Sequence, residues 1–413
     1  MKIRPLPRVA YSVTSQGMVS ACNFLLCLAL LYFSDAKHYV AFLLFINILQ
    51  LLTGLQNALF MSPVGVLVPR MQAAEVARAE RAAYRLAGLV ALAGLPFIAY
   101  FFVQPPRLAP AATAMVLATF LSTILLLQRE IARNACLLRA DLPMLVKYDA
   151  LYFLLAMVLA GVALSLHQLT FIAAVIAFAL PACLTRLSRP QWPGARTVAP
   201  DAALTAFDPQ FWGEVGRMVR WTVPGVVVTW LFSNGYWFVL EHTQDSATVA
   251  GIGAGRLLFA PVGLLIQGWL MQLRPLSVAM TSAGKGAELR RIVMRHSRAG
   301  LLCIALVTAA GCVLLTWFPH LLPHSMRAAG VIGYVIVWGI YFSVLWFRSG
   351  IAAMLMATAA GFKKVFYANT AVCAVFYALF LVSLDRIALP LALASLIVAE
   401  LLMLYLLHAR LDE

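Results

Sequence analysis

The stretch VFYANTAVCAVFYALFLVSLDRIALPLALASLIVAELLMLYLLH, residues 365–408, decides the fold of this chain. It holds two apolar runs of about 20 residues, the length that an α-helix needs to cross the hydrocarbon core of a bilayer. Between them lie only Asp385 and Arg386 as charged residues. So short a connection requires a tight reversal, which predicts two neighbouring antiparallel membrane-spanning helices.

Similar apolar runs continue outward along the whole chain. Hydrophobic residues make up 63%, charged residues 11%, and the mean hydropathy is +0.89, values far from those of a soluble globular domain. We therefore expect an all-α integral membrane protein with about twelve spans. The expected spans lie near residues 10–33, 39–68, 84–103, 110–133, 145–166, 168–187, 218–240, 248–273, 297–317, 329–357, 365–383 and 387–408.

The basic residues predict the orientation of these spans. Nearly all of the 31 Lys and Arg residues fall into every second connection. Because Lys and Arg stay on the cytoplasmic side of short loops during insertion, both termini are expected to be cytoplasmic. The formal net charge of +15 is then explained by cytoplasmic loops beside an anionic leaflet, and we expect no nucleic-acid partner.

The longest connection divides the chain into two halves. Its proline and acidic residues show no hydrophobic periodicity, which predicts a cytoplasmic linker at residues 190–216. The linker would join an N-terminal six-helix bundle, residues 1–189, to a C-terminal six-helix bundle, residues 217–413. A membrane enzyme such as a polymerase or acyltransferase would need an external catalytic loop, and the longest loop here is cytoplasmic. We therefore predict a transporter and not an enzyme.

Polar side chains share one face of several expected spans in the N-terminal half. In the second span Asn47, Gln50 and Asn57 lie within an arc of about 80°, and Gln16 and Asn23 share a face of the first span. Because a polar group that faces lipid is costly, such faces must meet protein or water. Hydrogen bonds between helices are one explanation. Matching faces on the first two spans of both halves favour a central aqueous cavity, in which these residues would bind substrate.

The eighth and tenth spans combine arginine with polar and aromatic side chains. Arg256 lies about 10 Å from the external end of the eighth span and shares a face with Gln267. Arg348 lies about 22 Å from the cytoplasmic end of the tenth span, near the middle of the membrane. It shares a stripe with three aromatic residues, Tyr334, Trp338 and Tyr341.

These six residues are also expected to bind substrate. A guanidinium stays charged, matches the oxygens of phosphate or carboxylate and stacks on rings, while aromatic faces suit sugar rings. A structural alternative is that Arg348 pairs with Glu400 of the twelfth span or extends its head to the interface. Glu400 is the only acidic residue well inside an expected span, so the wet interior would carry positive charge and favour an anionic cargo.

No motif in the chain predicts catalysis, a metal site or a cofactor. The seven cysteines are scattered without a CxxC pair and suit apolar packing. His320 and His324 have the spacing of a helical metal pair, but Pro319 and Pro323 interrupt the helix there. Phosphate-binding glycine loops, zinc motifs and nucleophile elbows are lacking. We expect no catalytic residue, no metal and no cofactor.

Three stretches carry a resemblance to a known family. They are GLQNA at residues 54–58 leading to Ser62-Pro63, QRE at residues 128–130 leading through Arg133 to Asp149, and GRL at residues 255–257 leading through Pro261 and Gln267 to Arg274-Pro275. On these residues the chain resembles the polysaccharide-export branch of the MOP superfamily, the Wzx-type oligosaccharide flippases. The same superfamily contains the MATE drug exporters and the lipid II flippases.

The resemblance implies a fold, a cargo and partners. The fold would be two six-helix bundles around a central cavity, working by alternating access in the bacterial inner membrane. The cargo would be an undecaprenyl-pyrophosphate-linked oligosaccharide, and the partners would be membrane lipids and a polysaccharide polymerase or co-polymerase, with the chain itself a monomer. The chain departs from its relatives at Ser233-Asn234-Gly235, where they often carry an acidic residue, which puts coupling to a cation gradient in doubt.

We expect basic residues at the cytoplasmic side to form a funnel that admits the cargo; they are Arg70, Arg129, Arg133 and Arg274.

The alternative function is a MATE-like exporter of drugs or small metabolites with the same architecture. Such an exporter would need a cavity lined by carboxylates, and the acid-poor spans argue against it.

Overall fold

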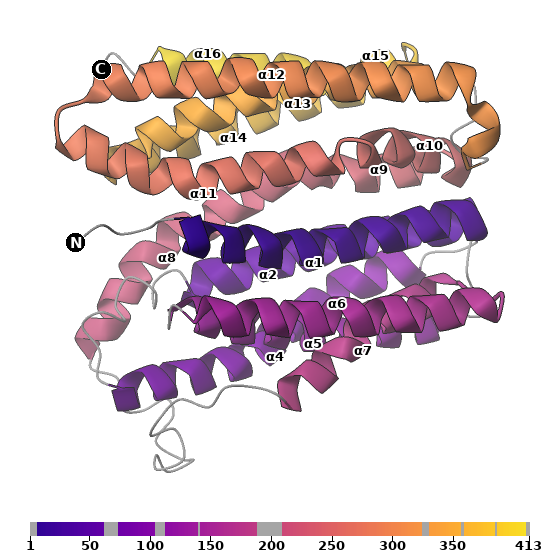
Figure 1. Cartoon of the computed structure of the whole chain (residues 1–413), viewed down its shortest axis with the longest axis horizontal. Coiled ribbons are helices and arrows are strands. Elements are labelled where there is room, and N and C mark those ends of the chain that lie inside the picture. The colour runs from indigo at the N-terminus through magenta and orange to yellow at the C-terminus, as the bar shows by residue number, and fades with distance from the viewer. Residues whose placement is uncertain are drawn as a thin grey trace. The chain divides into compact units, whose positions relative to one another are not determined.

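The computed structural model describes residues 6–61, 73–103, 112–138, 141–187, 209–323, 330–356, 359–384 and 386–409, and across these ranges every regular element is a helix (Figure 1). The chain divides into two compact units, Met1–Val227 and Val228–Glu413. Of the predicted linker, residues 190–208 lie outside the described residues. The predicted bundle boundaries therefore stay predictions.

In unit 1 the helices form a bundle in which consecutive helices contact each other and further contacts join helices that are not consecutive. The helix α1 packs on α6, and α5 packs between α4 and α7. The elements are α1 (Leu6–Phe33), α2 (Ala36–Gln56), the π-helical turn η1 (Asn57–Met61), α4 (Ala73–Val103), α5 (Ala112–Leu138), α6 (Leu142–Ser165), α7 (Phe171–Leu187) and the first part of α8 (Pro209–Trp230).

In unit 2 the helix α13 lies at the centre and packs on α10, α11, α12 and α16. The elements are the end of α8, the π-helical turn η5 (Leu231–Gly235), α9 (Tyr236–Thr243), α10 (Ser246–Leu257), α11 (Ala260–Ser282), α12 (Gly286–Trp317), the 3₁₀ turn η6 (Pro319–Leu321), α13 (Val331–Leu355), α14 (Ala359–Leu384), α15 (Leu389–Leu393) and α16 (Ser395–His408).

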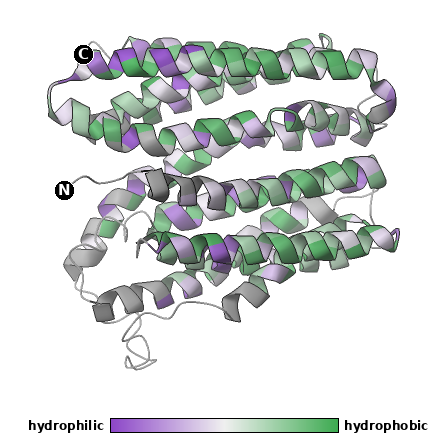
Figure 2. Cartoon of the chain, viewed as in Figure 1, coloured by the Kyte–Doolittle hydropathy of each residue, from purple (hydrophilic) through white to green (hydrophobic). Residues whose placement is uncertain are grey.

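The helices of both units have the length and apolarity of membrane spans. Ten helices in the described part of the chain meet these criteria, and the bent pair of α10 and α11 makes eleven. The apolar part of α7, Phe171–Cys183, is shorter. Most of their length is hydrophobic (Figure 2). The protein is therefore a multi-pass membrane protein, and the prediction of an all-helical fold with about twelve spans is confirmed.

Glycine allows one especially close helix contact in unit 2. A Cβ atom built on Gly300 of α12 would overlap the indole ring of Trp346 on α13. The Trp346 ring in turn stacks on Trp269 of α11, with centroids 5.3 Å apart. The helices α11, α12 and α13 are thus held together by the packing of the two indole rings against the backbone at Gly300.

Candidate functional site

The predicted eighth span is interrupted by a helix break at the end of α10. Pro261 has no backbone N–H to donate to the carbonyl group of Leu257, so the helix cannot continue through this point. The chain closes α10 with a hydrogen bond from the Phe259 N–H to the Arg256 carbonyl, 3.0 Å long, and restarts as α11 at a bend of 48°. Arg256 therefore occupies the last turn of α10, where the helix dipole favours a cation.

Three aromatic side chains surround the guanidinium of Arg256, and we call this group the Arg256 cage. The Cζ atom lies 5.4 Å from the ring centroid of Trp338 and 5.7 Å from that of Trp237. Its Nη1 donates a hydrogen bond to the Tyr236 hydroxyl at 3.0 Å. The two indole rings are nearly parallel, 20° apart, and Trp338 is fixed by its own hydrogen bond from Nε1 to the Ile252 carbonyl.

All partners of Arg256 in the cage are neutral. Within the described residues no carboxylate forms an ion pair with it, and Tyr236 is its hydrogen-bond partner. The side chain is partly exposed, so most of its N–H groups are not consumed by the protein. Cation–π contacts offset part of the cost of holding the charge in an apolar bundle but do not neutralise it. The Arg256 cage can therefore bind an anion.

Arg348 is different, because it has a counter-ion. Its Nε lies 2.6 Å from Glu400 Oε2, which joins α13 to α16. Glu400 is 1% exposed and Arg348 is 17% exposed. The structural alternative considered for Arg348 is thus what the structure shows, and the expectation of two arginines without a balancing carboxylate is wrong for Arg348. The other oxygen, Oε1 of Glu400, is buried without a hydrogen-bond partner among the described residues.

Unit 1 holds a larger charged group, which we call the Asp149 cluster. Asp149 on α6 is fully buried and accepts hydrogen bonds from Arg129 and Arg133 of α5 and from Ser15 of α1. Arg133 Nη1 also donates to Glu130 at 2.9 Å. The guanidinium of Arg129 lies 3.6 Å above the ring of Tyr152. Two cations meet two anions here, so the cluster is formally neutral and ties three helices together.

The arginines of the predicted cytoplasmic funnel lie in different surroundings. Arg129 and Arg133 are 5% and 7% exposed, so the expectation that they are accessible loop charges is wrong. The physical reason is Asp149, which neutralises both arginines from the adjacent helix. Arg274 is exposed on α11, and Arg70 lies outside the described residues. A funnel built on these residues stays a prediction for Arg274 and Arg70 alone.

The polar residues predicted in the N-terminal half are distributed over different surroundings. Asn47 is buried, whereas Gln50 is exposed on α2. Asn57 accepts a hydrogen bond from Asn134 at 3.3 Å, Gln16 accepts one from Arg133, and Asn23 accepts one from Cys27. Asn57 and Gln16 thus make hydrogen bonds between helices, as the alternative predicts, whereas the contact of Asn23 lies within α1. Their binding of substrate stays a prediction.

The aromatic stripe of α13 does not present open ring faces. Tyr334, Trp338 and Tyr341 are 8%, 0% and 4% exposed. Trp338 packs against Tyr236, Trp237 and Tyr341, so the expectation that it stacks on a sugar is wrong for this structure. The Trp338 ring lies against Arg256 instead. Gln267, about two helix turns beyond the break, is exposed on α11.

Sequence reasoning missed the cage because its members come from three helices. Tyr236 and Trp237 start α9, Arg256 ends α10 and Trp338 lies in α13. One signal was present: Gly255 precedes Arg256, and a Cβ atom there would lie 3.3 Å from Tyr334 Cβ and 3.5 Å from Trp338 Cδ1. A small residue at this place lets α10 approach α13 closely enough for the indole to reach the arginine.

Solved structures of membrane transporters share this fold. Lipid II flippase MurJ in an inward closed conformation superposes with a TM-score of 0.72 at 10% identity, covering 98% of this chain and 88% of that chain. An outward-facing multidrug-resistance MATE transporter of the MOP superfamily gives 0.65 at 14% identity, with 99% and 96% covered. A MATE structure in the straight conformation gives 0.65 at 12% identity, with 98% and 94% covered.

The relationship is visible in structure and not in sequence. No protein-family model and no curated protein sequence matches the chain. The superpositions extend over almost its whole length and include all the elements that position the Arg256 cage and the Asp149 cluster. The chain has the fold of the MATE and MurJ transporters of the MOP superfamily.

Proposed function

We propose that this protein is a flippase of the bacterial inner membrane that translocates an undecaprenyl-pyrophosphate-linked oligosaccharide by alternating access. The cargo would be a repeat unit of O-antigen, capsule or exopolysaccharide. The observation that carries the proposal is Arg256, a cation in a membrane span whose described partners are an aromatic hydroxyl and two indole rings. A pyrophosphate supplies the negative charge that this arrangement lacks.

The charges of unit 2 favour an anionic cargo over a cationic drug. A cation-binding site in a membrane needs carboxylates that are not already neutralised. Glu400 is the buried carboxylate of the described part of unit 2, and Arg348 lies against it. Arg256, which lies inside a span and has no ion-pair partner among the described residues, therefore remains available to an anion. The resemblance of the fold to a lipid II flippase agrees with a lipid-linked substrate but does not identify it.

Each member of the cage has a role in this proposal. Arg256 would bind the pyrophosphate through its remaining N–H groups, which form a planar fork that matches two phosphate oxygens. Tyr236, Trp237 and Trp338 would position the guanidinium and would not touch the glycan, because all three are buried. The exposed amide of Gln267 would donate hydrogen bonds to the cargo about two helix turns beyond the break.

The test is complementation of a deletion strain in which lipid-linked intermediates are quantified. We expect the deletion to accumulate such intermediates and the wild-type chain to clear them. Arg256→Ala should clear them about 10- to 100-fold more slowly at equal membrane abundance, the loss expected for one charge-assisted interaction. Arg256→Lys should keep part of the activity, because the charge stays and the fork is lost. Arg386→Ala, an exposed arginine at a helix connection, is the matched control.

Two outcomes would contradict the proposal at different levels. Full activity of Arg256→Ala would remove the site assignment while leaving the flippase function intact. A deletion strain without lipid-linked intermediates but with increased sensitivity to cationic drugs would favour the second candidate, a MATE-like exporter. That candidate is favoured by the MATE structures that share the fold.

A further inference from the structure

The helix α12 carries a basic stripe on the side that faces away from its own unit. Its buried residues, among them Leu289, Val293 and Ile304, lie on one side of the helix. Three exposed arginines, Arg291, Arg295 and Arg298, lie on the opposite side within an arc of about 60° at 100° per residue. We call these three residues and the leucines described next the α12 stripe.

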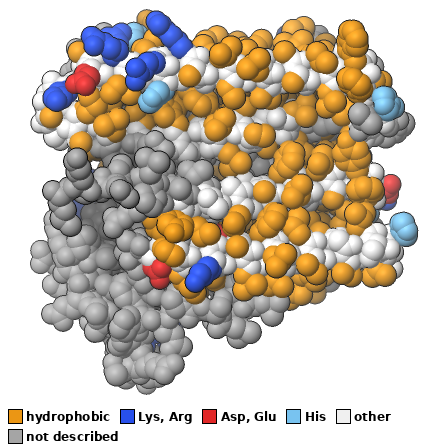
Figure 3. Space-filling model, viewed as in Figure 1, with side chains coloured by type: hydrophobic (Ala, Val, Ile, Leu, Met, Phe, Trp, Pro, Cys, Tyr) orange, Lys and Arg blue, Asp and Glu red, His pale blue; other side chains and the backbone are white. Residues whose placement is uncertain are grey.

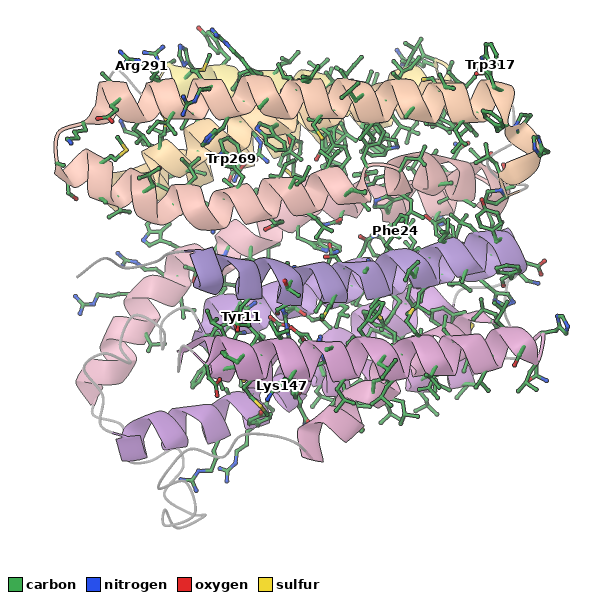
Figure 4. All side chains as sticks on the ribbon, viewed as in Figure 1. Tyr11, Phe24, Lys147, Trp269, Arg291 and Trp317 are labelled. Atoms are coloured by element: carbon green, nitrogen blue, oxygen red, sulfur yellow. The ribbon has the colours of Figure 1, made fainter. Side chains whose placement is uncertain are left out.

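Apolar side chains continue the stripe along the same face. Leu302 and Leu306 follow the arginines at helical spacing and are 65% and 63% exposed. In Figure 3 the blue side chains of unit 2 gather at one end, while hydrophobic side chains cover the remaining length. Figure 4 places Arg291 near that end of α12 and Trp317 at the other. The face is thus cationic for its first turns and apolar afterwards.

The length of α12 places the arginines at the membrane surface. The helix has 32 residues and is about 48 Å long, whereas the hydrocarbon core is about 30 Å thick. Counting back from the apolar end at Trp317, a core of that thickness is crossed within about 20 residues, which places Arg291 and Arg295 at headgroup depth and Arg298 at its boundary. Leu302 and Leu306 then lie at the depth of the acyl chains.

The arginines of the stripe are not neutralised by the protein. Among the described residues none of Arg291, Arg295 and Arg298 forms an ion pair, and the nearest acidic residue in sequence is Glu288 in the first helical turn. The neighbouring His296 is turned to another side of the helix, where its ring accepts a hydrogen bond from Trp269 at 3.3 Å. Three closely spaced cations without partners call for an external anion.

We propose that the α12 stripe is a binding site for an anionic phospholipid of the leaflet at this end of the protein. The headgroup phosphate, which no cationic substituent compensates, would contact Arg291, Arg295 and Arg298, and an acyl chain would lie along Leu302 and Leu306. The continuity of charged and apolar surface on one helix face favours a lipid over a free anion, because a free anion has no apolar part that could contact the leucines. The site lies on the outer face of α12 and is distinct from the Arg256 cage.

The experiment is lipid titration of the purified full chain followed by native mass spectrometry. Phosphatidylglycerol and phosphatidylethanolamine with identical acyl chains are added to the protein in detergent. We expect tighter binding of phosphatidylglycerol, weakened by added salt. Arg291→Gln/Arg295→Gln/Arg298→Gln should weaken phosphatidylglycerol binding about 100-fold, since each basic residue near a surface contributes about a factor of five. The triple lysine variant should retain most of the binding.

Two further variants and binding of inorganic pyrophosphate alone test the proposal. Leu302→Ser/Leu306→Ser should weaken binding while leaving all charges in place, and it also tests the site if the triple glutamine variant does not fold. Arg217→Gln/Arg220→Gln/Arg386→Gln, which removes three exposed arginines elsewhere, should bind as the wild type does. Equal binding of the two lipids, unchanged binding by the triple glutamine variant, or equally tight binding of inorganic pyrophosphate alone would overturn the proposal.

Discussion

The two units hold charge inside a helical bundle in opposite ways. In unit 1 both carboxylate oxygens of Asp149 accept hydrogen bonds, and the two arginines around it are buried. In the described part of unit 2, Glu400 pairs with Arg348 and its Oε1 has no hydrogen-bond partner, while the contacts of the Arg256 guanidinium are with aromatic side chains. The arginines of the pairs come from the fourth expected span of each half, so the comparison is between similar positions.

The difference indicates that the Asp149 cluster and the Arg256 cage have different roles. A buried, formally neutral set of charges whose Asp149 oxygens already accept hydrogen bonds from both arginines and Ser15 gains little from a ligand. An uncompensated cation at a helix break has interactions still to make. We therefore expect substitutions in the Asp149 cluster to act mainly on stability, and substitutions in the Arg256 cage to act mainly on transport.

The largest effect should follow from Asp149→Asn. The amide leaves Arg129 and Arg133 buried without their shared counter-ion, and breaking a buried pair in this way costs about 3–5 kcal/mol. The melting temperature of the protein in detergent should fall sharply, and less folded protein should reach the membrane. Glu130→Gln is the matched control. Glu130 is partly exposed and its hydrogen bond is with Arg133, which Asp149 also binds, so its loss should cost clearly less. Equal stability of the Asn variant and the wild type would show that the cluster is not a tie between α1, α5 and α6.

A double-substitution cycle on Arg348 and Glu400 should give the next largest effect. Arg348→Gln leaves a carboxylate buried without its cation and should cost about 2–3 kcal/mol. The double variant Arg348→Gln/Glu400→Gln removes both charges and should recover most of that loss, because a neutral pair no longer carries a desolvation cost. Thermal unfolding of the four proteins measures the coupling. Additive losses would mean that the two side chains do not interact in the membrane.

Glycine positions in the two units offer a smaller contrast. Gly300→Ala in α12 forces a methyl group into the ring of Trp346 and should cost about 1–3 kcal/mol by overpacking. Gly88→Ala in α4 has open space around the new atom and should be neutral or slightly stabilising, since alanine favours the helix. Unfolding in detergent compares the two variants. A Gly300→Ala protein as stable as Gly88→Ala would mean that α12 and α13 separate easily.

Much of the fold followed from apolar length and charge alternation, because a bilayer admits few solutions to backbone hydrogen bonding. The Asp149 cluster also had a readable signal. Arg133 and Asp149 lie at equal distances in sequence from Asp141, which caps α6 after the α5–α6 turn. In an antiparallel helix pair, such positions come level with each other, so their side chains meet.

The features that stayed hidden depend on helices that are distant in sequence. Glu400 lies in the last span, and only the packing of α13 on α16 brings it to Arg348. The Arg256 cage needs α9, α10 and α13 together, and its aromatic residues alone are equally consistent with a sugar-binding face or a buried core. Polarity along one helix predicts which side of the helix faces away from lipid, but it does not show whether that side contacts protein or water.

The smallest effect should come from the two aspartates that begin the second helix of each unit. Asp35 and Asp245 have nearly the same backbone conformation, with φ of −69° and −72°. Asp245 accepts hydrogen bonds from the backbone N–H groups of Ala247 and Thr248 and from the Thr248 hydroxyl, whereas Asp35 makes no capping bond and lies 3.6 Å from Lys37. Asp245→Ala should therefore cost about 1 kcal/mol, and Asp35→Ala should cost less.

The pH dependence sharpens this contrast. The hydrogen bonds from Thr248 and Ala247 hold the pKa of Asp245 below its ordinary value. A lowered pKa means that the carboxylate stabilises the folded state at neutral pH and that this contribution is lost as the pH falls through the folded-state pKa. The stability difference between wild type and Asp245→Ala should thus begin to shrink near the ordinary carboxyl pKa, at about pH 4, and vanish only below the lowered folded-state pKa. A difference that persists there would show that the side chain stabilises α10 by packing and not as a charged cap.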